Sequence, residues 1–208
     1  MKRILTFAAT LTLLALFVAP AQAQQAERVR FALQGGVTSS NLTGDDISGT
    51  SSRTGFLAGV GFNYFFARSL SLGLEGNWLA GLGAKESSGD AETKVSYLAF
   101  PVTLNFVFPL GENEKTWIGL QSGITAMLRL TCDIDLGGLS SGNVDCKEDT
   151  ESSNFAIPLG ATLGFKMTDA AVVYLLARYQ LGLSSVVKDE DVKLNFWEFI
   201  LGVGFPTG

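Results

Sequence analysis

Histidine is absent from this chain of 208 residues. A hydrolase that relies on a histidine base and a zinc site that relies on imidazole ligands are therefore both excluded. The glycine pairs Gly35-Gly36 and Gly137-Gly138 lack the strand, turn and helix that together cradle a phosphate group. The sequence thus predicts no catalytic, cofactor-binding or metal-binding residues and no enzymatic activity.

Two cysteines, Cys132 and Cys146, lie in one polar segment of the chain. A disulfide that closes a loop of about 15 residues contributes roughly 3 kcal/mol in the chain-entropy model, and an oxidising compartment preserves it. A metal site or a reactive thiol would need further ligands or an activating base, and neither is evident nearby. We therefore expect Cys132 and Cys146 to form a disulfide.

Acidic residues surround these cysteines and recur near the end of the chain. They could bind calcium, but the pair Asp133 and Asp135 is not followed by the regularly spaced oxygens and closing glutamate of an EF-hand. A solvated acidic surface is the favoured interpretation, and divalent ions bridging to lipopolysaccharide phosphates are a weaker alternative. The residues are Asp133, Asp135, Asp145, Glu148, Asp149, Glu151 and Asp189-Glu190-Asp191.

The N-terminal segment has the pattern of a secretory signal peptide. Lys2 and Arg3 precede an apolar run over 4–19, and small residues follow to Ala23. An anchoring helix is the alternative, but the run is short for a bilayer and its Ala-x-Ala ending suits signal peptidase. We expect cleavage after Ala23, which leaves residues 24–208 as one domain.

The composition beyond this segment favours a membrane protein without membrane helices. The chain is 47% hydrophobic and only 17% charged, yet no later apolar run approaches the length of a membrane helix. Since only helices and closed barrels satisfy all backbone polar groups in a bilayer, a transmembrane β-barrel is expected. The net charge of −5 argues against nucleic acid as a partner.

Apolar side chains alternate with small or polar ones in eight segments. In 69–82, for example, the apolar series Leu70, Leu72, Leu74, Trp78, Ala80 and Leu82 alternates with Ser71, Gly73, Glu75, Asn77 and Gly81. This period of two predicts strands that show lipid and lumen in turn. The eight segments are 29–37, 56–66, 69–82, 98–108, 118–130, 155–167, 173–183 and 195–205.

The connections alternate in length, as in an eight-stranded antiparallel up-and-down transmembrane β-barrel. The long ones are 39–53, 83–94, 131–153 and 184–193, and we expect them outside the cell. The short ones are 67–69, 109–115 and 168–170, on the periplasmic side with both termini. A soluble periplasmic barrel would carry many charges on its polar face, whereas this face is mostly Gly, Ser, Thr, Asn and Gln.

Three charged residues, Glu75, Arg178 and Glu198, fall at inward positions near mid-depth of their predicted strands. Because buried charges are normally paired, we expect Arg178 to bind both carboxylates and to close the lumen. The alternative makes Glu75 and Glu198 a proton-transfer or ligand-binding pair.

Four motifs carry a resemblance to a known family. They are GVGFNYFF at 59–66, YLAFPV at 97–102, ARYQLGL at 177–183 and the closing LGVGF at 201–205. With them the chain resembles the small outer-membrane β-barrel proteins, in particular the PorT-like domain and the OmpX- and OmpA-like barrels. The resemblance implies residence in the outer membrane among lipid and lipopolysaccharide, and assembly by the barrel-insertion machinery. That machinery reads a terminal aromatic residue in such proteins, but here Phe205 is followed by three further residues.

Two classes of function stay open. The first is a structural or surface-interaction barrel, or a secretion-associated one, as the resemblance to PorT-like proteins implies. The second is a ligand-binding or small-solute transport barrel, which the narrow interior of an eight-stranded barrel disfavours. A lipid-modifying enzyme is a third and weaker hypothesis.

Overall fold

The structure, a computed structural model, describes residues 28–44, 50–86, 92–111, 114–135, 143–146, 150–188 and 192–207. The predicted signal peptide and its cleavage site lie outside these residues. The described part consists of strands and contains no helix long and apolar enough to cross a membrane. The strands are β1 (Val29–Thr43), β2 (Thr50–Ala67), β3 (Leu70–Glu86), β4 (Glu92–Leu110), β5 (Thr116–Asp135), β6 (Asn143–Asp145), β7 (Ser153–Thr168), β8 (Ala171–Gly182) and β9 (Lys193–Thr207).

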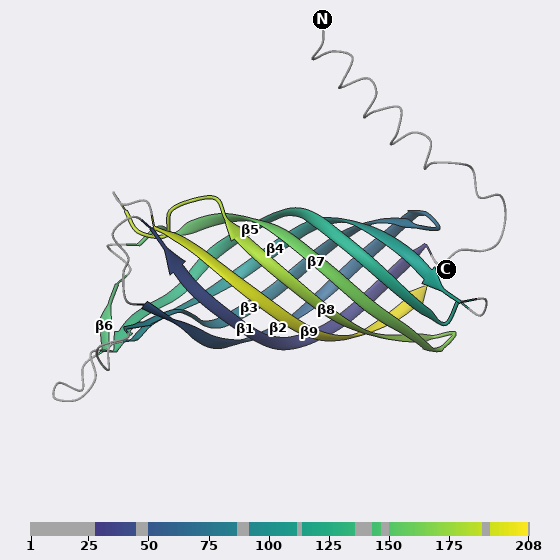
Figure 1. Cartoon of the computed structure of the whole chain (residues 1–208), viewed down its shortest axis with the longest axis horizontal. Helices are drawn as coiled ribbons and strands as arrows, with labels where there is room; N and C mark the ends of the chain where they lie inside the picture. The colour runs from purple at the N-terminus through teal and green to yellow at the C-terminus, as the bar shows by residue number, and fades with distance from the viewer. Residues whose placement is uncertain are drawn as a thin grey trace, which may run out of the picture.

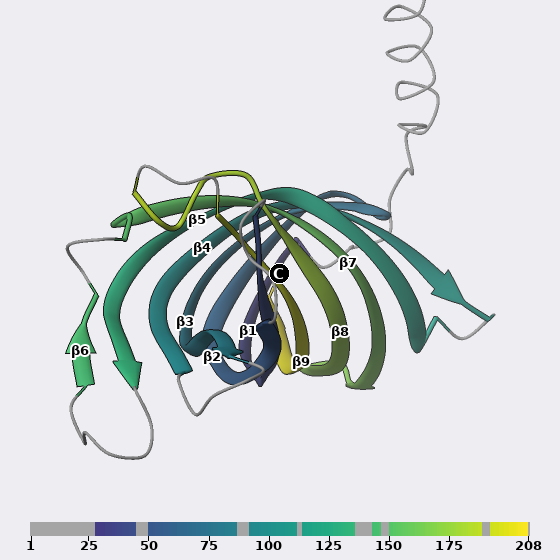
Figure 2. The same cartoon turned by 60° about the vertical axis from the view of Figure 1, so that its left-hand side comes forward.

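Eight long strands form a closed antiparallel barrel, as the alternating pattern predicts. The order is β4-β3-β2-β1-β9-β8-β7-β5, and β4 also pairs with β5 to complete the ring. The tilted strands cross the long axis of the molecule (Figure 1), and the oblique view shows them curving about a common axis (Figure 2). Closure leaves no long strand with an unpaired edge, which is the condition for crossing a bilayer.

The connections separate into two ends of the barrel. The β2–β3, β4–β5 and β7–β8 connections lie with the C-terminus at one end, here called the turn end (Figure 1). The opposite end, here called the loop end, carries the β1–β2, β3–β4, β5–β7 and β8–β9 connections. Val29 and Thr207 are register partners, so β1 also starts at the turn end.

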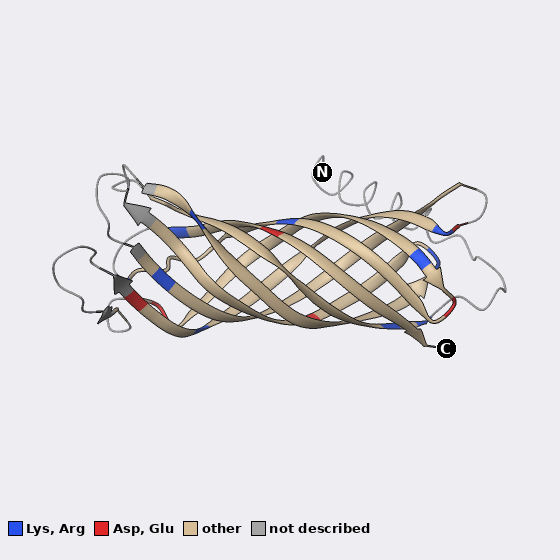
Figure 3. Ribbon diagram, turned by 90° about the horizontal axis from the view of Figure 1, so that it is seen from below, with Lys and Arg blue, Asp and Glu red and all other residues tan. Residues whose placement is uncertain are grey.

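Large apolar side chains cover the outside of the barrel. Leu33, Val60 and Ile124, for example, are each more than half exposed. Charged residues lie mostly at the two ends, and few mark the middle of the barrel (Figure 3). A band of this kind is stable only where lipid, and not water, surrounds it.

The predicted alternation of outward and inward faces is wrong at one residue of β3, Leu82. Leu79 pairs with Tyr97 and Leu82 with Val95, so β3 advances three residues while β4 advances two. This bulge lies at Gly81, whose positive φ of 73° is a conformation that glycine adopts without strain. It reverses the faces beyond it, and Leu82 is fully buried in the lumen instead of facing outward.

The strands extend beyond the predicted segments at the loop end. β5, predicted to end at residue 130, runs to Asp135, and β3 runs to Glu86. Hydrogen bonding between neighbouring strands does not require apolar side chains, so the pairing continues past the outward apolar band. Within the predicted third external connection, the short β6 pairs with the end of β5 (Figure 2).

The interior of the barrel differs between its two halves. Toward the loop end it is mainly apolar, with Leu79, Leu82, Tyr97, Met127 and Phe196 all fully buried, although Ser40 and Asn154 are buried there as well. Mid-depth and the turn half hold mainly polar side chains. Apart from Leu82, these buried apolar residues stand at inward positions of the predicted alternation, but the pattern does not show that they gather in one section of the lumen.

Candidate functional site

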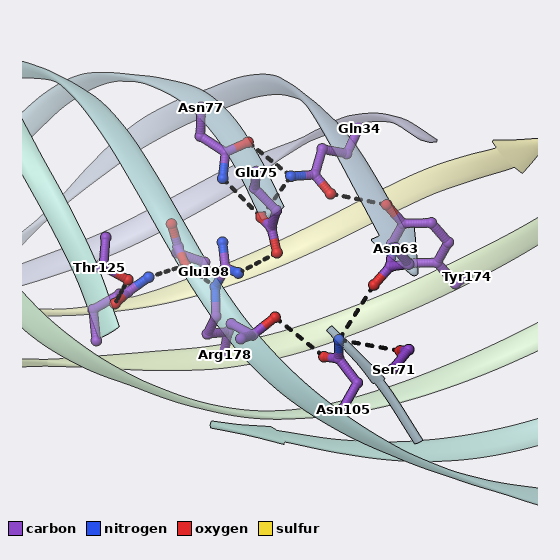
Figure 4. A network of polar contacts seen from close by, with 12 residues as sticks. Gln34, Asn63, Ser71, Glu75, Asn77, Asn105, Thr125, Tyr174, Arg178 and Glu198 are labelled. Carbon is purple, nitrogen blue, oxygen red and sulfur yellow. Dashed lines mark hydrogen bonds and ion pairs between the residues drawn. The ribbon is translucent and has the colours of Figure 1, made fainter. Parts of the chain in front are cut away.

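Arg178 lies at the centre of the lumen between the two predicted carboxylates. Its Nη1 donates to Glu75 Oε1 at 2.8 Å and its Nε donates to Glu198 Oε2 at 2.5 Å. Glu198 is the register partner of Arg178 on the adjacent strand β9. Glu75 belongs to β3, four places from β8 around the ring of eight, so the Arg178–Glu75 ion pair joins opposite walls (Figure 4).

Neutral side chains extend this ion-pair cluster around the wall. Gln34 Nε2 donates to Glu75 Oε2 at 2.8 Å and to Asn77 Oδ1 at 2.7 Å. Asn77 Nδ2 donates to Glu75 Oε2 at 2.8 Å, and the Tyr174 hydroxyl donates to Gln34 Oε1 at 2.8 Å. Glu75 is therefore held by three different side chains (Figure 4).

A second arm of the network supports Glu198. Gln180 Nε2 donates to Glu198 Oε2 at 3.0 Å, and Thr125 Oγ1 donates to Gln180 Oε1 at 3.0 Å. The complete network thus involves β1, β3, β5, β8 and β9 and fixes the rotamers of its charged members. We refer to Gln34, Glu75, Asn77, Thr125, Tyr174, Arg178, Gln180 and Glu198 as the lumen network.

The electrostatics of the lumen network favour a structural role. Arg178 and Glu198 are fully buried and the Glu75 side chain is about nine-tenths buried. One guanidinium serves two carboxylates, and a charge taken so far from water needs such pairing to remain ionised. Because the guanidinium does not give up its proton, it holds the carboxylates apart instead of relaying protons between them.

Sequence reasoning identified the charged residues but not their neutral partners. Gln34, Asn77, Tyr174 and Gln180 are ordinary polar residues in the sequence, and nothing in their spacing marks them as members of a network. The signal that could have found them is their inward register combined with the known position of Glu75 and Arg178.

Cys132 and Cys146 form a disulfide, with their Cα atoms 5.3 Å apart. It joins the loop-end part of β5 to the residue that follows β6, and both cysteines are buried. Of the predicted acidic surface, Asp133 and Asp145 are register partners on β5 and β6. Glu148, Asp149 and Asp189-Glu190-Asp191 lie outside the described residues, so the calcium alternative stays open.

Comparison with known proteins agrees with this architecture. Residues 9–205 match the family described as "Outer membrane protein beta-barrel domain". No protein with a curated description matches the sequence.

Three solved structures that match this fold are distant from the chain in sequence. OprG from Pseudomonas aeruginosa is 14% identical with a TM-score of 0.50, and the match covers 88% of this chain and 97% of OprG. Neisserial surface protein A is 15% identical with a TM-score of 0.49, and the match covers 85% of this chain and 97% of that protein. The outer membrane enzyme PagL is 15% identical with a TM-score of 0.48, and the match covers 85% of this chain and 99% of PagL.

Proposed function

Because the chain belongs to the outer membrane protein β-barrel domain family, we propose that it is a non-conducting barrel that presents its loop end for surface interaction or a secretion-associated role. It is an integral protein of the outer membrane. The connections at the loop end face outward from the cell, and the turn end faces the periplasm, as is general for such barrels.

The observation that carries the proposal is the obstruction of the lumen. The Arg178–Glu75 ion pair crosses the bore at mid-depth, and fully buried apolar side chains fill the section toward the loop end. An eight-stranded barrel is just wide enough for side chains to fill it. Ions would therefore have to displace both a paired charge cluster and a packed apolar layer.

Conductance measurement in planar bilayers tests the proposal. Purified refolded protein should give no discrete current steps under a voltage at which an open porin, inserted in the same membrane as a positive control, conducts. Reproducible current steps that scale with the amount of inserted protein would overturn the proposal of a non-conducting barrel and favour the small-solute transport alternative.

The geometry of the loop end supports a role in surface presentation. The disulfide attaches the segment around β6 to β5, which is itself part of the barrel wall. A loop held in this way loses less conformational entropy when it meets a partner. We propose that lipopolysaccharide and a protein partner are its natural neighbours.

We propose that export follows the predicted route, with cleavage after Ala23 and insertion by the barrel-insertion machinery. The outward residues of β9, from Phe199 to Phe205, are exposed and available as an assembly signal. Intact-mass measurement should place the mature N-terminus at Gln24, and density-gradient fractionation should recover the protein with the outer membrane. Recovery with the soluble periplasm would contradict the route.

We propose no catalytic role. PagL, an outer membrane enzyme of the same fold, is the reason to test the point, whereas the complete lack of histidine in this chain removes the base that such hydrolysis commonly uses. An assay for lipid deacylation with refolded protein is the appropriate measurement, and turnover above a heat-denatured control would refute the proposal.

A further inference from the structure

A cavity of about 50 Å³ lies inside the turn half of the barrel. The wall of the cavity toward the loop end includes Gln34, Glu75 and Tyr174 of the lumen network. The network therefore separates the cavity from the apolar section of the lumen. Toward the turn end the lining reaches Arg30 and Trp117, each of which is the second residue of its strand. The cavity therefore extends from mid-depth to the periplasmic rim.

Three side chains that line the cavity contact one another at that rim. The guanidinium of Arg30 lies 5.0 Å from the ring centre of Phe65 and 5.2 Å from that of Trp117. A Cβ at residue 164 would lie only 2.0 Å from the indole ring of Trp117. The ring can therefore take this position only because residue 164 is glycine. We call Arg30, Phe65 and Trp117 the rim cluster.

The polar groups between the rim cluster and the lumen network are mostly uncharged. Asn105 Nδ2 donates to Asn63 Oδ1 at 3.2 Å and to Ser71 Oγ at 3.4 Å, and Thr162 adds a hydroxyl. The carboxylate of Glu75 is already engaged by Arg178, Gln34 and Asn77. The lining therefore offers amide and hydroxyl groups, but no carboxylate without a partner among the described residues.

Gln121 provides an independent sign that the cavity binds something polar. Its Nε2 is buried and has no hydrogen-bond partner among the described residues, and Gln121 lines the cavity. A buried amide donor without a partner is unfavourable, because the hydrogen bond that it made to water in the unfolded chain is not replaced. A guest with a hydrogen-bond acceptor would remove that cost.

We propose that this cavity is a dead-ended chamber that takes water and small uncharged polar solutes from the periplasm, with the rim cluster as its gate. One water occupies roughly 10–15 Å³ of such volume, so the chamber suits a few waters or one solute of urea size. Cations are disfavoured because the one lining carboxylate, Glu75, is already engaged by Arg178. Anions are disfavoured in the depth of the chamber because the lining's one cation, Arg30, lies at the rim, so they would be desolvated without an opposite charge beside them. The inference goes beyond the surface role proposed above and depends on the same closure at mid-depth.

Alkylation of single introduced cysteines tests the chamber, because the native cysteines are bonded to each other. Gly61 lines the cavity, and a Cβ there would meet no atom closer than 3.6 Å, so Gly61→Cys places a thiol inside without a clash. Ala156→Cys is the matched control, since Ala156 is fully buried in the lumen on the loop-end side of the network. Refolded protein is treated with iodoacetamide, a small uncharged amide, or with iodoacetate, its anionic analogue, and intact mass gives the rates.

Iodoacetamide should alkylate Gly61→Cys at least about tenfold faster than Ala156→Cys, whose thiol becomes accessible only through local opening. The preference for iodoacetamide over iodoacetate should be larger at Gly61→Cys than at a cysteine in an exposed connection. Thr162→Cys, which also lines the cavity, serves as a second probe if Gly61→Cys does not fold.

The gate is tested on the same background. Arg30→Ala should speed the alkylation of Gly61→Cys severalfold, whereas Leu82→Ala, which loosens the apolar section, should leave its rate unchanged. Protection of both Gly61→Cys and Thr162→Cys, or an equal response to Arg30→Ala and Leu82→Ala, would overturn the chamber and leave the non-conducting barrel intact. Equally fast alkylation of Gly61→Cys and Ala156→Cys, at the rate of an exposed cysteine, would instead show that the lumen is open throughout and overturn both proposals.

Discussion

Arg178 is the residue on which the interior of this barrel depends most. Replacing it by leucine removes the cationic partner of two carboxylates, Glu75 and Glu198, which lie deep in the lumen. Breaking a buried ion pair from one side costs about 3–5 kcal/mol. Arg178→Leu should therefore lower the free energy of unfolding by that amount, measured by urea titration of protein refolded in lipid vesicles.

A double-mutant cycle separates this contact from a general packing defect. Glu198→Gln in the Arg178→Leu background removes one of the stranded charges while keeping the shape of the side chain, so it should recover part of the lost stability. In the wild-type background the same substitution should be destabilising. Strict additivity of the two changes would show that Arg178 and Glu198 do not interact.

The disulfide gives a second prediction at the scale of single residues. Iodoacetamide without reductant should label neither Cys132 nor Cys146 in the folded protein. The double variant Cys132→Ser/Cys146→Ser should still insert, because the eight-stranded ring is complete without the bond. It should be cut faster by external protease near β6, and unchanged cleavage would mean that the bond does not restrain the loop.

At the scale of the strand, depth in the membrane decides the cost of a charge. Leu201 is more than half exposed on the outside of β9 and lies at the middle of its outward apolar series. Leu72 faces outward only two residues after the start of β3. An arginine on the lipid face costs about 2–4 kcal/mol at the midplane and about 0–1 near an interface.

Leu201→Arg should therefore lower the free energy of unfolding by about 2–4 kcal/mol and Leu72→Arg by about 1 or less. Both variants carry the same substitution on the same face, so the comparison isolates depth. Denaturant titration in vesicles provides the measurement, and equal losses would contradict the assigned position of the apolar band.

The strand pattern predicted the face of most residues before the bulge at Gly81, but not the space available on that face. Gly73 faces inward as the alternation requires, but the alternation does not show how much room a side chain would have there. In the structure, a Cβ at residue 73 would lie 2.5 Å from Thr103 Oγ1 and 2.9 Å from Asn105 Nδ2. Such distances depend on neighbours from other strands, which a periodic pattern does not encode.

This contrast yields a prediction with a matched control on the same inner wall. Gly73→Ala should cost about 1–3 kcal/mol through overpacking of the Thr103 and Asn105 side chains. Gly61→Ala, whose Cβ would have room, should be close to neutral. Comparable unfolding midpoints for the two variants would mean that the side chains around Gly73 adjust freely.

Over the whole molecule, sequence was sufficient for the number of strands, their order and the closure of the ring, because alternation and connection lengths are local signals. It was insufficient for the bulge at Gly81 and for the burial of Leu82. A single glycine can reverse every face beyond it, and whether it does so depends on the register with β4. The burial of Leu82 follows from that register, whereas Leu79, Tyr97 and the other buried apolar residues face inward by unbroken alternation.

The obstruction of the lumen consists of two barriers in series, and this arrangement predicts how conductance responds to mutation. The first is the lumen network, where Arg178 bridges opposite walls. The second is the apolar section toward the loop end, where Tyr97 and Phe196 are fully buried. Because an ion must pass both, removing either one alone should leave the barrel closed.

The prediction concerns two paired variants and their combination. Arg178→Ala/Glu198→Gln weakens the polar barrier, and Tyr97→Ala/Phe196→Ala removes large side chains from the apolar one. Each pair alone should give no current steps in planar bilayers, whereas all four substitutions together should give small discrete steps, provided that the refolded protein keeps its β-sheet circular dichroism. Current from one pair alone would identify a single barrier and would reject the serial arrangement. A closed, correctly folded quadruple variant would show that other inward side chains of this narrow barrel suffice to block it.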